Sequence, residues 1–202
     1  MNLIPESHEI SDYLKSDKYV DFYNPNIKLK AKELFKYCMD EAEKVRVAFE
    51  FVRDAIPHSW DIKSARITRT ASEVLHYGEG ICYAKSLLLA ALLRSAGIPT
   101  GFCYQRLTLG STPDTGYVVH ALNAVYLAEL DRWIRLDARG STTEVNPQFS
   151  VKEDMLEFPV RPEYEEFDYP TVYIAPHPVT METLELWIDC SEMYQTGLPT
   201  KL

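Results

Sequence analysis

The chain has 202 residues, of which 46% are hydrophobic and 25% are charged, and it contains 8 glycines and 12 prolines. This composition excludes collagen-like, low-complexity and wholly disordered chains, and it predicts a globular fold that buries about 70% of the surface of the unfolded chain. The formal net charge of -9 disfavours a general affinity for nucleic acid or for anionic lipid.

The N-terminal half is predicted to be helical. Residues 1–27 indicate at most a short helix around residues 10–14, and apolar residues at helical spacing over 29–56 predict one long helix or two abutting ones. Cys38 lies on that apolar stripe, so we expect it in the core. A shorter pattern over 70–77 predicts another helix.

A central buried helix is predicted over residues 81–96, which are rich in strong helix formers and apolar on nearly every face. Gly78 and Gly80 break the chain before it. Gly97 suits a left-handed C-terminal cap and Pro99 prevents continuation, so the end of the helix is well marked.

Three β-prone runs follow, over 100–109, 117–127 and 133–137, and the last two are joined by a hairpin-like connection. Helices that precede an antiparallel sheet indicate an α+β fold. Beyond residue 139, we expect 146–170 to wrap the surface and 180–194 to form a final amphipathic helix. No linker or repeat is present, so residues 1–202 are interpreted as one domain, with 140–202 as an extension packed on the core.

Four scattered cysteines lack the spacing of a disulfide scaffold or of a zinc site, so we expect free thiols and no metal. The acidic residues at 163, 165, 166 and 168 lack a calcium-loop pattern and are expected to be solvated. The sequence contains no glycine-rich nucleotide-binding loop, so we expect no cofactor. No apolar run reaches the roughly 20 residues that span a bilayer and no secretory leader is evident, which predicts a cytoplasmic protein.

Cys82 is the candidate nucleophile among the four cysteines. It is predicted to lie in the first turn of the central helix, where free N–H groups and the helix dipole favour negative charge. Its backbone N–H is also placed to stabilise an oxyanion. Cys103 and Cys190 lie in apolar contexts and are expected to pack in the core.

His120 lies within the second β-prone run, and Asp137 ends the third. Residues directly opposite on antiparallel strands stand about 5 Å apart, so the two can hydrogen-bond if the register allows. An imidazole that takes and returns the proton of Cys82, steadied by a carboxylate, is the arrangement that nucleophilic catalysis requires.

The run from Gly80 to Ser86, the run from Ala91 to Pro99, His120, and the run from Trp133 to Asp137 together resemble the transglutaminase-like superfamily. The resemblance covers about residues 45–137. It implies a papain-like α+β fold with a central helix that starts at the nucleophilic cysteine, and it implies Cys82 as nucleophile, His120 as general base and Asp137 as its orienting partner.

Four further residues are candidates for the oxyanion or substrate site. Trp60 carries an indole N–H that could serve as the second oxyanion donor, and Tyr83 follows the nucleophile. His58 and Asp61 border the same polar segment and are candidates to line a substrate cleft.

The residues therefore predict a thiol-dependent amide or peptide hydrolase or acyl transferase that works through an acyl thioester. The expected substrate is a protein or a peptide-like amide, with water or a primary amine as acceptor; the sequence indicates no oligomeric state. Two alternatives are an acyl transferase resembling the arylamine N-acetyltransferases, which would need an acetyl-coenzyme A site, and a papain-fold interaction module without turnover.

Overall fold

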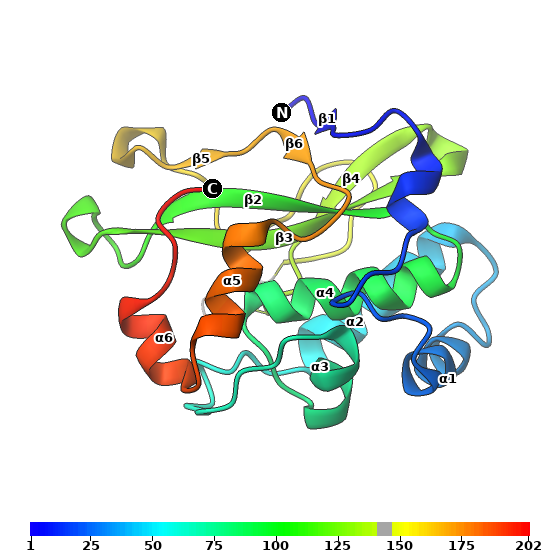
Figure 1. Ribbon diagram of the computed structural model, residues 1–202. Coiled ribbons are helices and arrows are strands. Elements are labelled where there is room, and N and C mark those ends of the chain that lie inside the picture. Colours follow the sequence, from blue (N-terminus) through cyan, green and yellow to red (C-terminus); the bar gives the residue numbers. More distant parts are fainter. Residues whose placement is uncertain (141–146) are drawn as a thin grey trace.

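The computed structural model describes residues 1–140 and 147–202, so part of the segment predicted to wrap the surface lies outside the described residues. A four-stranded antiparallel sheet packs against a central helix, α4 (Cys82–Ser95), and further helices lie on the same side (Figure 1). The predicted α+β class is confirmed. Within the described residues, no helix combines the length and apolarity that crossing a bilayer requires.

The sheet has the order β4-β3-β2-β5, and the strands are β2 (Thr100–Thr108), β3 (Tyr117–Leu127), β4 (Arg132–Leu136) and β5 (Phe167–Asp168). Two two-residue strands, β1 (Ile4–Pro5) and β6 (Thr171–Val172), pair in parallel. Short 3₁₀ helices occupy Ile10–Leu14, Pro113–Thr115, Ala128–Leu130 and Pro162–Tyr164. The three predicted strands are β2, β3 and β4, whereas β5 is too short to leave a periodic pattern.

Helix α4 is the centre of the hydrophobic core, and every residue from Tyr83 to Arg94 is buried. Its end is as predicted, because Gly97 follows with a φ of +78°, a left-handed conformation that glycine adopts without strain. The guanidinium of Arg94 is also buried and donates hydrogen bonds to the backbone carbonyls of Lys15, Thr100 and Ile174.

The helical region before α4 forms α1 (Pro25–Leu34), α2 (Glu41–Ala55) and α3 (Ala71–Tyr77). A new helix starts at α2 because the Asp40 side chain accepts the N–H of Glu43. The turn before it takes Cys38 out of the apolar stripe and leaves it half-buried, with Met39 90% exposed. The expectation that Cys38 packs in the core is therefore wrong.

The predicted final helix is in fact two, α5 (Pro178–Leu186) and α6 (Cys190–Thr196). Trp187 is extended, and Asp189 starts α6 by accepting the N–H groups of Ser191 and Glu192. Ile188 lies in this break and is 89% exposed. The break turns α6 so that it reaches the N-terminal end of α4.

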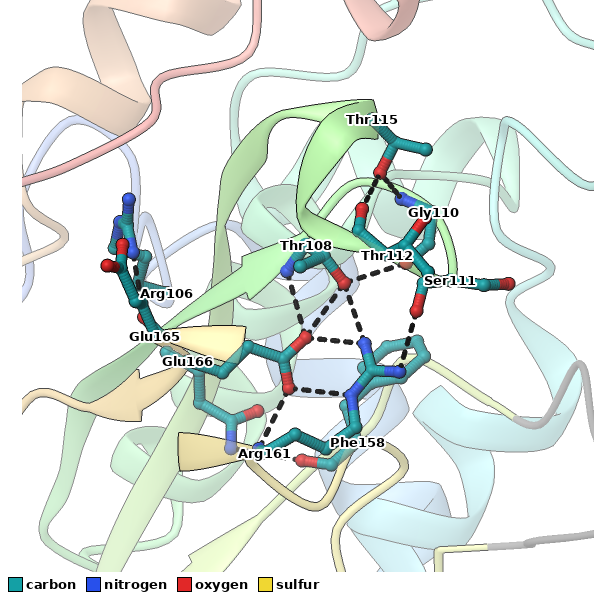
Figure 2. A network of polar contacts seen from close by, with 11 residues as sticks. Arg106, Thr108, Gly110, Ser111, Thr112, Thr115, Phe158, Arg161, Glu165 and Glu166 are labelled. Carbon is teal, nitrogen blue, oxygen red and sulfur yellow. Dashed lines mark hydrogen bonds and ion pairs between the residues drawn. The ribbon is translucent and has the colours of Figure 1, made fainter. Parts of the chain in front are cut away.

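The acidic segment before β5 is not uniformly solvated as expected, because Glu166 is buried. Its carboxylate accepts hydrogen bonds from the N–H and hydroxyl of Thr108 and from the backbone and guanidinium of Arg161 (Figure 2). Arg161 also donates to the Ser111 carbonyl. This network ties residues 161–166 to the β2–β3 hairpin.

We expect Glu166→Gln to lower the free energy of unfolding by about 1–3 kcal/mol at pH 7, because charge-assisted hydrogen bonds to a buried group are lost. Burial opposes ionisation, but the bonds from Arg161 and Thr108 lower the pKa of Glu166 to about 2. A lowered pKa means that this stability is present above the pKa of the unfolded state, about 4.5, and is lost as the pH falls towards 2.

Urea denaturation of both proteins at pH 7 and pH 3 tests this expectation, with Glu163→Gln as control because Glu163 is exposed. The difference between wild type and Glu166→Gln should shrink at pH 3. A difference as small as that of the control at pH 7 would contradict it.

Candidate active site

Cys82 is the first residue of α4 and is half-buried. Gly80 lets the chain approach closely before it, since an added Cβ would lie 3.0 Å from the Ala84 Cβ and 3.1 Å from the Thr68 Oγ1. The predicted position of Cys82 at the helix N-terminus is therefore confirmed. Negative charge on its sulfur is favoured there by the helix dipole.

His120 on β3 and Asp137, one residue after β4, form a buried pair, with 2.9 Å between His120 Nε2 and Asp137 Oδ2. The register of β3 and β4 ends at Asn123 and Leu136, so the two side chains meet beyond the paired strands rather than directly opposite. Because Nε2 faces the carboxylate, Nδ1 is the ring nitrogen left for Cys82, which lines the same cavity as His120.

Two backbone N–H groups, in addition to His120, position the carboxylate of Asp137. Its Oδ1 accepts the backbone N–H of Arg139 at 3.1 Å, and its Oδ2 accepts that of Glu157 at 3.3 Å. Burial opposes its charge, but His120 and these N–H groups lower the pKa of Asp137. Asp137 is thus a fixed negative charge behind the ring.

Asp137 and Cys82 both affect the pKa of His120. Burial alone would lower the pKa of His120, but the negative charges of Asp137 and of an ionised Cys82 outweigh it and raise the pKa to about 10. A protonated His120 is therefore favoured beside Cys82, and an imidazolium is the partner that a cysteine nucleophile requires.

His58 lies on the other side of Cys82, and its Nε2 accepts the Cys82 backbone N–H at 3.2 Å. The side chain is buried, and its Nδ1 has no partner among the described residues. Burial, followed by the positive charges of Arg139 and Lys85, holds the pKa of His58 well below 6.5. The ring is therefore neutral at pH 7.

The other sequence candidates have different surroundings. Asp61 forms a bidentate ion pair with Arg139, with both N–O distances at 2.9 Å. Tyr83 is buried and its hydroxyl donates to the Val119 carbonyl at 2.8 Å, so it joins α4 to β3. Trp60 is 37% exposed and stacks on Tyr194 at 4.4 Å between ring centroids, outside the cavity described next.

A cavity of about 550 Å³ opens at Cys82, and the residues that line it include His58, Tyr83 and His120. Tyr194 of α6 and Arg139 line it too, although the sequence analysis singled out neither. Arg139 stands two residues after Asp137, which is a local signal, whereas nothing in the sequence connects Tyr194 with Cys82.

Lys85 lies one helical turn after Cys82, with its ammonium buried against the backbone carbonyls of Arg53, Ile56 and Arg139. Burial, and then the charge of Arg139, lower its pKa to about 7. These bonds tie the end of α2 and the segment after Asp137 to α4. Within the described residues, no group of three or more His, Cys, Asp or Glu side chains is placed to hold a metal ion.

The family model of the transglutaminase-like superfamily matches residues 29–138. No curated protein sequence matches the chain. Among solved structures, one described as a candidate cysteine protease from Cytophaga hutchinsonii has 18% identity and a TM-score of 0.55, and the match covers 70% of this chain and 44% of that one. The periplasmic domain of TgpA from Pseudomonas aeruginosa has 18% identity and a TM-score of 0.47, with 62% and 45% covered. The chain thus spans less than half the length of either.

Proposed function

The chain belongs to the transglutaminase-like superfamily, and on this premise we propose that it is a thiol-dependent enzyme that acts on an amide or peptide-like carbonyl. The observation that carries the proposal is the buried His120–Asp137 pair next to Cys82 at the start of α4. Cys82 is the nucleophile, His120 the general base and acid, and Asp137 the positioning residue.

In the proposed reaction, the Cys82 thiolate attacks the carbonyl carbon while His120 holds the proton taken from the thiol. The carbon–nitrogen bond of the tetrahedral intermediate breaks, and His120 gives that proton to the departing amine. The acyl thioester is then attacked by water or by a primary amine, which loses a proton to His120 as the Cys82 sulfur departs.

For the oxyanion, we propose two donors, the Cys82 backbone N–H and the His58 ring. The Cys82 N–H is directed at His58 Nε2, with 3.2 Å between the two nitrogens, so an oxyanion that enters replaces this hydrogen bond and lies between the two groups. His58 must then carry its single proton on Nε2, a change of tautomer that is open to a neutral ring whose Nδ1 has no partner among the described residues. Turnover of a folded His58→Phe variant at the wild-type rate would exclude this role.

The proposed donor is a protein or peptide-like amide. The net charge of -9 favours cationic amines over anionic ones as acceptors. We further propose that residues 1–202 act as one unit, because one hydrophobic cluster of the described residues extends from Val20 to Met193. We propose the cytoplasm as its location because free cysteines are typical of a reducing compartment. Mass spectrometry of a peptide library, with and without a primary amine, distinguishes hydrolysis from transfer.

The same measurement separates the alternatives. Loading of Cys82 with an acetyl group from acetyl-coenzyme A would favour an enzyme resembling the arylamine N-acetyltransferases. If neither this donor nor any peptide modifies Cys82, a binding module is favoured.

Cys82 should be alkylated by a low dose of iodoacetamide near pH 7 faster than the other three cysteines. Burial raises the pKa of Cys103 to about 12 and that of Cys190 to about 11, and it also raises the pKa of Cys38. Cys82 instead has the helix N-terminus and His120 beside it. Peptide mapping after brief labelling of the folded protein gives the four rates, and equally slow labelling at all four positions would refute the proposal.

A further inference from the structure

The cavity next to Cys82 is larger than the catalytic groups need, and its walls come from segments far apart in the sequence. At about 550 Å³ it falls within the range of small-molecule sites. It runs from Cys82 along the β2–β3 hairpin, and residues 158–161 and the C-terminal segment after α6 complete it. Its apolar lining includes Leu107, Leu109, Val118, Phe158, Pro159 and Leu198.

The charged side chains in the described lining are neutralised by partners. Arg139 is held by both oxygens of Asp61 at 2.9 Å, and Arg161 pairs with Glu166 at 2.6 Å. A charged group that entered the cavity would therefore lose its hydration without gaining an unpaired opposite charge.

The outer wall of the cavity, formed by the β2–β3 hairpin and residues 158–161, is fixed by hydrogen bonds. Glu166 binds Thr108 of β2 and Arg161 at once, and Arg161 reaches the Ser111 carbonyl in the hairpin (Figure 2). Phe158 packs edge-on against His120, with 5.2 Å between ring centroids. The apolar cavity thus continues directly from the reacting atoms.

We infer that this cavity binds an uncharged, apolar side chain of the acyl donor, adjoining the carbonyl that Cys82 attacks. The inference rests on the proposed function and names its substrate class. Removing such a side chain from water is worth about tenfold to a hundredfold in binding.

The test uses the N-acetyl chloromethyl ketones of glycine, leucine and aspartate. In each, the Cys82 sulfur bonds to the methylene carbon as the carbon–chlorine bond breaks, chloride leaves, and the thiol proton passes to His120. Intact mass and peptide mapping give each rate at Cys82, and each is divided by the rate with free N-acetylcysteine. The leucine probe should react at least about tenfold faster than the glycine probe, and the aspartate probe more slowly than both.

Leu109→Glu, in the lining and 43% exposed, should lower the leucine-to-glycine ratio at least about threefold, because it places a carboxylate in the apolar wall. Leu130→Glu is the matched control, since Leu130 is 47% exposed in the β3–β4 connection and is not part of the lining. It should leave the ratio unchanged.

Normalised rates that agree within about twofold for the three probes, or a fastest reaction with aspartate, would overturn the inference. Because each ratio compares reactions at one thiol, it remains informative even if Cys82 labels with iodoacetamide no faster than Cys38. That result would refute the proposed function instead.

Discussion

Replacing Cys82 with alanine is expected to abolish the acyl adduct and to lower turnover of any amide substrate by about 10⁴-fold or more, because the described residues that line the cavity include no other thiol to form the thioester. Acyl adducts are followed by intact mass, and turnover is followed on the best peptide from the library screen. Alanine removes only the sulfur at the first turn of α4, so the helix should persist.

The matched control is Cys38→Ala, which removes a half-buried thiol in the turn before α2. It should keep wild-type turnover and still form the adduct. Circular dichroism must show that both variants are folded. Turnover by a folded Cys82→Ala protein would refute the mechanism.

Removing the base should be nearly as damaging. His120→Ala is expected to lower turnover by about 10²- to 10⁴-fold, because both proton transfers lose their carrier. Asp137→Asn should cost less than His120→Ala, since an amide oxygen can still accept the Arg139 N–H and hold the ring imperfectly.

The pH profile distinguishes positioning by Asp137 from a general loss of structure. The Asp137 charge raises the pKa of His120, so Asp137→Asn should move the alkaline limb of kcat/KM to lower pH, where the imidazolium then loses its proton. The direction of the shift follows from the raised pKa of His120: an asparagine carries no charge to hold the proton on the imidazolium, so the ring loses that proton at a lower pH. An unmoved limb with reduced kcat would contradict the electrostatic role.

Much of the candidate active site could be predicted from short stretches of sequence. Helix α4 and its end at Gly97 follow from residues that are neighbours in the chain, and these also place Cys82 at the helix N-terminus. The strands that carry His120 and precede Asp137 left equally local patterns. Their pairing across β3 and β4 was predictable because a hairpin connects them, although the bond forms just beyond the paired register.

Errors arose where a polar side chain starts or stops an element. Asp189 begins α6 by accepting backbone N–H groups, and it divides a stretch whose apolar spacing predicted one final helix. Asp40 begins α2 in the same way, which decides between the one long helix and the two abutting ones predicted over 29–56 and takes Cys38 out of the apolar stripe. The buried Glu166 is an error of another kind. A carboxylate in an acidic stretch predicts solvation, and only Arg161 and Thr108, brought to it by the fold, stabilise its burial.

The fold class and the candidates Cys82, His120 and Asp137 were predictable from the sequence, because helix propensity, capping and strand alternation depend on residues close together in the chain. The packing of the folded chain is what places His58 rather than Trp60 against the Cys82 N–H and brings Tyr194 into the cavity lining. Those contacts join residues 24 or more positions apart. Their formation depends on how whole elements pack around a shared core, which no local pattern records.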